Sequence, residues 1–235
     1  AACTAAEGGP LRAGAARVEV TPPPNPAQPP SGRYAHEKLY VRAIVVDNGA
    51  TRAALIGADL AGLGEAVWAN ASKQIAAELD CPVEHIVMSP THTHSGRMPV
   101  LGGPRGAAGA QGGPSASAST GEIEARILEA VRQAKAKLQP ARMGFGRGAA
   151  YVNTNRDAID PETRLWHQGP NSEGASDKTL TVIKFETPAG ELIAAYANYA
   201  MHPINLYLTG ITSADFPGAA SRYVEEQYDD RAVVI

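Results

Sequence analysis

Hydrophobic and polar positions follow one another along the chain in patterns that predict both strands and helices. Two segments rich in Val and Ile, 39–47 and 51–59, flank Asn48-Gly49, a dipeptide that strongly favours a β-hairpin turn. Segments 179–186 and 191–199 repeat this arrangement around a Thr-Pro-Ala-Gly turn. The pattern therefore predicts two hairpins, each of which pairs its strands antiparallel.

Helical periodicity occurs in three further segments. Apolar residues recur every four positions over 65–79, as on the buried face of an amphipathic helix. A capping-box pattern at 119–122 precedes a second apolar stripe, and 218–228 predicts a third helix. Short apolar runs predict additional strands at 17–20, 85–89, 142–148 and 231–235. We therefore expect an α/β fold in which helices pack on a mixed β-sheet.

The remaining segments indicate how the domain is bounded. Residues 1–15 are mostly small and predict a flexible N-terminal tail, which leaves 16–235 as one domain. The prolines within 21–26 favour an extended segment, and the Gly- and Ala-rich stretch 102–119 favours a loop. No turn follows the last predicted strand, 231–235, so we expect the domain to continue beyond it.

Composition excludes several classes of protein. Hydrophobic residues make up 44% of the 235 positions, which is enough for a core and excludes a disordered chain. No apolar run approaches the ~20 residues of a membrane-spanning helix, and the net charge of −3 does not attract nucleic acid. Cys81 is expected to be a small buried residue, with a disulfide to Cys3 as the alternative. Cys3, in the run Ala-Ala-Cys-Thr, also fits the processed end of a lipid-anchored protein.

His92 and His94 directly follow the predicted strand 85–89, in the run Thr-His-Thr-His-Ser-Gly. In an extended backbone, residues two apart face the same way, so both imidazoles can point into one pocket. Sites in α/β proteins form at the carboxyl ends of strands. A neutral imidazole binds zinc and also transfers protons. We therefore interpret the pair as part of a functional site at the strand ends.

His202 stands at the end of another predicted strand. A catalytic zinc site needs three protein ligands and an open position for water, so His202 is a candidate partner for the two histidines above. Asp215 and Glu186 are available carboxylates, but spacing alone selects neither of them.

Arg156, in the run Asn-Thr-Asn-Arg after the predicted strand 142–148, is the last candidate. Its guanidinium can hold a carbonyl, carboxylate or phosphate group through its fork of donors, although the spacing equally fits a surface salt bridge. The other histidines have no nearby partner in the sequence and receive no function; they are His36, His85 and His167.

Six stretches of the sequence occur in the same order as in one known family. They are 16–23, 44–59, 89–96, 153–156, 202–203 and 212–218. The most specific of them contains the Thr-His-Thr-His-Ser-Gly run. On these stretches, which extend over nearly the whole chain, the sequence resembles the neutral, non-lysosomal ceramidase family.

In that family a single zinc ion activates water to hydrolyse the amide bond of ceramide, which releases sphingosine and a fatty acid. The resemblance implies that His92 and His202 bind this zinc ion. It also implies that His94 faces the substrate and that Arg156 holds or polarises it. The expected partner is therefore a lipid-like amide, with ceramide as the first choice, and a peripheral contact with a membrane.

The resemblance further implies that this chain holds only part of the site. The family's other zinc ligands, a Glu and a Tyr, and its catalytic Ser loop would lie past Ile235. We therefore expect the chain alone to bind zinc weakly and to turn over little substrate. Arg97-Met98-Pro99 stands where relatives often have Pro-Gly-Gly, so this part of the pocket differs. Relatives are secreted or membrane-associated, which predicts a location outside the cytoplasm.

Three alternatives remain open from the sequence. The first is a metal-dependent hydrolase of another amide or ester. The second is an amidohydrolase barrel, in which both histidines of a His-x-His pair bind metal, although two hairpins do not fit the strand–helix alternation of a barrel. The third is a cell-surface binding domain with a degenerate site, which would hold no stoichiometric zinc.

Overall fold

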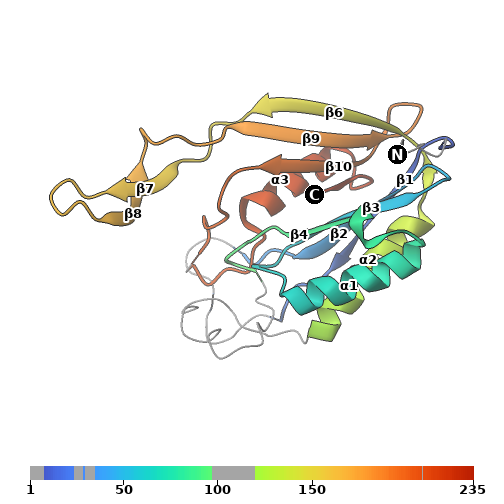
Figure 1. Cartoon of the computed structure of the whole chain (residues 1–235), viewed down its shortest axis with the longest axis horizontal. Coiled ribbons are helices and arrows are strands. Elements are labelled where there is room, and N and C mark those ends of the chain that lie inside the picture. Colours follow the sequence, from blue (N-terminus) through green and yellow to red (C-terminus); the bar gives the residue numbers. More distant parts are fainter. Residues whose placement is uncertain (1–7, 24–28, 30–34, 97–119, 208) are drawn as a thin grey trace, which may run out of the picture.

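The larger of two mixed sheets carries the first part of the chain (Figure 1). The computed structural model describes residues 8–23, 29, 35–96, 120–207 and 209–235. The sheet has the order β4-β3-β2-β1-β5, with β1 (Arg12–Glu19), β2 (Tyr40–Asp47), β3 (Arg52–Ala58), β4 (Ile86–Pro90) and β5 (Gln139–Pro140). β3 and β4 run parallel, whereas the other neighbours run antiparallel.

The smaller sheet has the order β11-β10-β9-β6 and is mixed as well. Its strands are β6 (Arg142–Ala149), β9 (Thr179–Glu186), β10 (Leu192–Tyr199) and β11 (Val233–Val234). Between β6 and β9, the chain forms a two-stranded ribbon of β7 (Asn155–Ile159) and β8 (Trp166–Asn171). This ribbon projects away from both sheets at the left of Figure 1.

The elements form three layers. Helices α1 (Glu65–Leu79) and α2 (Thr120–Ala136) cover one face of the larger sheet, and a short 3₁₀ helix, Val83–His85, leads from α1 into β4. The smaller sheet and α3 (Asp215–Gln227) lie on the other face (Figure 1). One core fills the space beneath the helices, and a second core, with Ile44, Phe185 and Ile193, joins the two sheets.

Local sequence explains the elements that could be predicted. The four-residue apolar repeat of α1 becomes its buried face, which consists of Val67, Ala71, Ser72, Ile75 and Leu79. Both hairpins form as expected, and Gly49 and Gly190 take the positive φ values of 83° and 93° that their turns require. The α/β class with mixed sheets and packed helices is confirmed.

Three expectations about elements differ from the structure. β1 begins at Arg12, so residues 12–15 belong to a strand and not to a flexible tail. Ala13 and Ala15 belong to the core between the sheets, and alanine gives a weak strand signal. The segment around Trp166 forms β8 and not a loop, and the strands form two sheets where one was expected.

Other expectations concern segments that the structure covers only in part. The Gly- and Ala-rich stretch 102–119, Cys3 and most of the proline-rich segment lie outside the described residues. Cys81 is a free thiol that is half-buried against the helix core, and desolvation raises its pKa. Within the described ranges, no helix combines the length and the hydropathy needed to cross a membrane.

Candidate metal centre

The turn after β4 holds His92 by its backbone and by its side chain. The His92 amide donates a hydrogen bond to the Leu60 carbonyl at 3.0 Å, and Nδ1 lies 2.6 Å from the Ala61 carbonyl oxygen. Because a carbonyl can only accept, this contact selects the tautomer of the neutral ring in which Nδ1 carries the proton and Nε2 has the lone pair. The backbone of His92 has a φ of 63°, which a bulky residue rarely adopts without support from its surroundings.

The loop after β10 brings His202 to the same place. The His94 amide donates a hydrogen bond to the carbonyl oxygen of Pro203 at 3.3 Å, which joins the two histidine-bearing loops. The rings of His92 and His202 stack with centroids 5.0 Å apart, and the His94 ring meets both edge-on. Tyr207 also packs edge-on against His94.

The spacing of the imidazole nitrogens fits one metal ion. Nε2 of His94 lies 3.4 Å from Nε2 of His92 and 2.9 Å from Nε2 of His202, and one ligand nitrogen of each residue lies within 4.8 Å of the others. Two nitrogens bound to one tetrahedral zinc ion at ~2.0–2.1 Å are about 3.3 Å apart. The geometry gives all three histidines access to the same ion.

The environment keeps two of these histidines in the form that binds metals. Burial lowers the pKa of His94 below its ordinary value, and the neighbouring His202 and His92 lower it further. Burial, followed by the proximity of His92, also lowers the pKa of His202. Both imidazoles are therefore neutral at pH 7, and their lone pairs are available to a metal ion.

The two carboxylates that sequence spacing left open have different surroundings. Glu186 is the last residue of β9, where it forms ion pairs with Arg142 and Lys184 at 3.1 and 2.5 Å. Asp215 lies beside the histidines, but both of its oxygens accept hydrogen bonds from the residues around them. Neither carboxylate is among the groups that could hold the ion within the described part of the chain.

Comparison with known proteins decides the family. A sequence profile described as "Neutral/alkaline non-lysosomal ceramidase, N-terminal" matches residues 25–234. The chain belongs to this family. The resemblance predicted from the six stretches is thus confirmed.

Relatives in this ceramidase family extend beyond the length of the chain. A neutral ceramidase from Drosophila pseudoobscura pseudoobscura is 25% identical over 93% of this chain and 32% of its own length. The crystal structure of neutral ceramidase from Pseudomonas aeruginosa has the same fold, with a TM-score of 0.66, 21% identity, and 96% of this chain and 37% of that chain covered. A second structure, a ceramidase complexed with C2, has a TM-score of 0.68 at 22% identity over the same shares. The chain therefore spans about a third of the length of these relatives.

Arg156 occupies a different position from the three histidines. It is exposed on β7 of the projecting ribbon, where Nε donates a hydrogen bond to the Gly169 carbonyl oxygen at 3.2 Å. No hydrogen bond joins its guanidinium to the histidine cluster within the described residues. The structure thus brings together three of the four predicted site residues, and a role for Arg156 remains a prediction.

The sequence analysis did not identify the residues whose hydrogen bonds support the segments around the three histidines. Ser213 contacts the His92–His94 turn, and Glu37 in turn accepts a hydrogen bond from the Ser213 hydroxyl. His36, which received no function, accepts a hydrogen bond from the Thr212 amide at 3.0 Å. The motif at 212–218 was the only signal that could have pointed to this segment.

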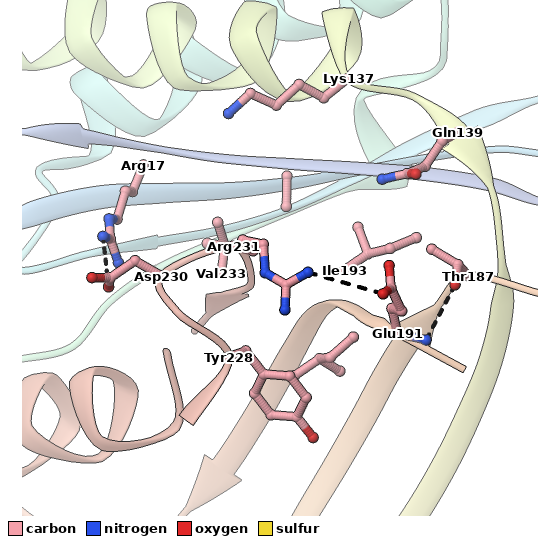
Figure 2. Close-up of a pocket in the computed structure, with 12 residues that line it drawn as sticks. Arg17, Lys137, Gln139, Thr187, Glu191, Ile193, Tyr228, Asp230, Arg231 and Val233 are labelled. Carbon is pink, nitrogen blue, oxygen red and sulfur yellow. Dashed lines mark hydrogen bonds and ion pairs between the residues drawn. The ribbon is translucent and has the colours of Figure 1, made fainter. Parts of the chain in front are cut away.

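A separate pocket of about 330 Å³ lies where β1, the end of α2 and the β9–β10 turn approach the C-terminal segment (Figure 2). None of the three histidines lines it. Four of the charged side chains that line it form two ion pairs, Arg17 with Asp230 at 3.0 Å and Arg231 with Glu191 at 3.9 Å. The pocket is therefore distinct from the candidate metal centre of this ceramidase-family chain.

Proposed function

We propose that the protein carrying this chain is a zinc-dependent amide hydrolase of the ceramidase type. The observation that carries the proposal is the convergence of His92, His94 and His202, with nitrogen spacings that suit one ion. Membership of the ceramidase family supports a lipid-like amide as the substrate, with ceramide as the first choice. Because the chain spans a third of its relatives' length, turnover is proposed for the whole protein.

We assign His92 and His202 as metal ligands and His94 as the group that faces the substrate. The bond from His92 Nδ1 to the Ala61 carbonyl supports this role, because it presents Nε2 to the ion and fixes the ring. His94 is placed next to both ligands, where its imidazole can exchange a proton with the reacting amide. Arg156, from the ribbon, would hold or polarise the substrate carbonyl.

A bound zinc ion supplies Lewis acidity and lowers the pKa of water to about 7, which gives a nucleophile at neutral pH. The residues of the chain orient the reaction around it. Tyr207 packs against the His94 ring and limits its rotation. The neutral state of His94 lets it accept a proton when water attacks and return that proton to the leaving amine.

Zinc titration of the chain and of single variants tests these roles. We expect one zinc ion per chain, and we expect His92→Ala or His202→Ala to weaken binding by at least about tenfold, because each removes a ligand. His94→Ala should keep most of the zinc affinity. In the whole protein, it should lower hydrolysis of a short-chain ceramide by about 10²- to 10⁴-fold, the usual contribution of acid–base catalysis. His167→Ala, on the exposed ribbon, is the matched control.

The outcomes separate the alternatives. Equal loss of zinc in all three histidine variants would make His94 a third ligand and would contradict its assignment to the substrate. A whole protein that binds no zinc would contradict the proposed function and would favour a binding domain. Zinc binding without ceramide hydrolysis, but with turnover of simple amides or esters, would keep the mechanism and replace the substrate.

A further inference from the structure

The segment Ser213–Asp215 contacts both of the loops that carry the histidines of the candidate metal centre. Ser213 holds the first loop: its carbonyl oxygen accepts a hydrogen bond from Thr93 Oγ1 at 2.7 Å, and its amide donates to the Ser95 carbonyl at 2.8 Å. Thr93 and Ser95 flank His94 on either side. The position of His94 is therefore tied to this short segment.

Asp215 holds the second loop. Its Oδ1 accepts a hydrogen bond from Asn205 Nδ2 at 2.7 Å, and its Oδ2 accepts one from the Leu206 amide at 2.9 Å. Asn205 and Leu206 lie between His202 and Tyr207 in the loop that follows β10. One carboxylate thus holds the part of this loop that joins a candidate ligand to the ring that packs on His94.

The local structure of Asp215 is specialised for this contact. The residue is 3% exposed, begins α3, and has a φ of 56° in the left-handed region. Its amide donates to Ser213 Oγ at 2.9 Å, and Oδ1 also accepts from the amide of Phe216 at 2.7 Å. A left-handed, buried, non-glycine residue persists only when its surroundings determine its conformation, and such residues concentrate at functional sites.

We propose that Asp215 is a positioning residue that sets the distance of His202 from His92 and His94. It acts through Asn205 and the Leu206 amide and does not bind the ion itself. The inference rests on the proposed function, because the spacing of the three histidines matters for a metal centre. The contacts that carry it, however, exist in the chain without an ion.

Zinc affinity, measured by competition with a chromophoric chelator, tests the proposal. We expect Asp215→Ala to weaken Zn²⁺ binding by about tenfold, the lower end of the range for residues that orient ligands. Asn205→Ala removes one of the bonds at an exposed side chain and should have a smaller effect in the same direction. Asp160→Ala is the matched control, because Asp160 also accepts bonds from two backbone amides, but within the turn of the ribbon.

A second measurement needs no metal and remains informative if Asp215→Ala destabilises the fold. In the metal-free chain, the ring-proton NMR signals of His94 and His202 should shift in Asn205→Ala, because Tyr207 and His202 move with their loop. The signals of His85 should stay unchanged, because its ring contacts the Arg52 carbonyl and belongs to neither of the two loops that carry the candidate metal centre. Circular dichroism confirms that each variant is folded.

The two proposals fail in different ways. Unchanged ring-proton signals in folded Asn205→Ala, or unchanged zinc affinity in folded Asp215→Ala, would overturn the positioning role and leave the metal centre intact. A whole protein that binds no Zn²⁺ would overturn the proposed function. In that case, the shifts of His94 and His202 in Asn205→Ala would still support the control of ring spacing by Asp215.

Discussion

At the scale of single residues, the chain places several charged groups where water does not reach them. Arg42 on β2 is 4% exposed, and it lies between Asp59 and Glu225, each 1% exposed. Arg42 Nη1 contacts Asp59 Oδ2 at 2.9 Å, and Nε contacts Glu225 Oε1 at 3.2 Å. Burial raises the pKa of the Asp59 carboxyl, and the positive charge of Arg42 opposes this rise. The cluster connects the larger sheet to α3, the helix that begins at Asp215.

We expect Arg42→Met to lower the free energy of unfolding by about 3–5 kcal/mol at pH 7, because it leaves the buried Asp59 carboxylate without its cation, whereas Glu225 keeps its ion pair with Arg17. Without Arg42, the pKa of Asp59 rises further above its unfolded value. The protonated carboxyl is then tolerated in the folded state, so the deficit should shrink as the pH falls towards ~4. Denaturant unfolding at both pH values measures this. Arg126→Met, at an exposed ion pair within α2, should change stability by less than about 1 kcal/mol.

At the scale of elements, α2 approaches β1 so closely that one position of the strand requires glycine. A Cβ atom on Gly14 would lie 2.2 Å from the Ala134 carbonyl oxygen and 2.7 Å from the Leu138 amide nitrogen. Both are backbone atoms at the end of the helix, so neither can rotate away. The sequence of β1, with its small residues, therefore determines how near the helix layer sits.

Gly14→Ala should lower the free energy of unfolding by about 1–3 kcal/mol, because the added methyl group forces α2 away from the sheet. Thermal and denaturant unfolding measure the loss. Gly146→Ala on β6 is the matched control, since its added Cβ would meet no atom within 4 Å. A similar stability for the two variants would contradict the close approach of α2 to β1.

The elements that the sequence predicts are those with a local signal of their own. Helix α1 and the two main hairpins have local signals, a four-residue repeat and a glycine turn, and all three formed as expected. The β7–β8 ribbon has exposed residues on both faces, so its sequence lacks the alternation of apolar and polar side chains that predicts a strand.

For the site, the strand-end histidines were predictable from their positions in the sequence. Their support was not, because Ser213 contacts Thr93 and Glu37 across 120 and 176 residues.

At the scale of the whole molecule, the layers define where the candidate metal centre can form. His92 and His94 follow β4 of the larger sheet, and His202 follows β10 of the smaller one. The histidines therefore meet only if the two sheets keep a fixed relation to each other. That relation depends on the core between the sheets, in which Phe185 is the largest buried side chain.

Phe185→Ala tests this dependence, because it removes a 3% exposed aromatic ring from the contact between the sheets. We expect a loss of about 3–5 kcal/mol in the free energy of unfolding. Hydrogen exchange should show faster opening of β9 and β10 than of β2 and β3, since the helix layer still covers the larger sheet. Zinc affinity should fall in the folded variant as His202 loses its fixed distance from His92.

Phe145→Ala is the control. Because Phe145 is 64% exposed on β6, its removal should leave the free energy of unfolding and the zinc affinity near those of the unchanged chain. Uniform exchange in both sheets of Phe185→Ala would mean that they unfold as one unit, and an unchanged zinc affinity in the folded variant would contradict the dependence of the metal centre on this core.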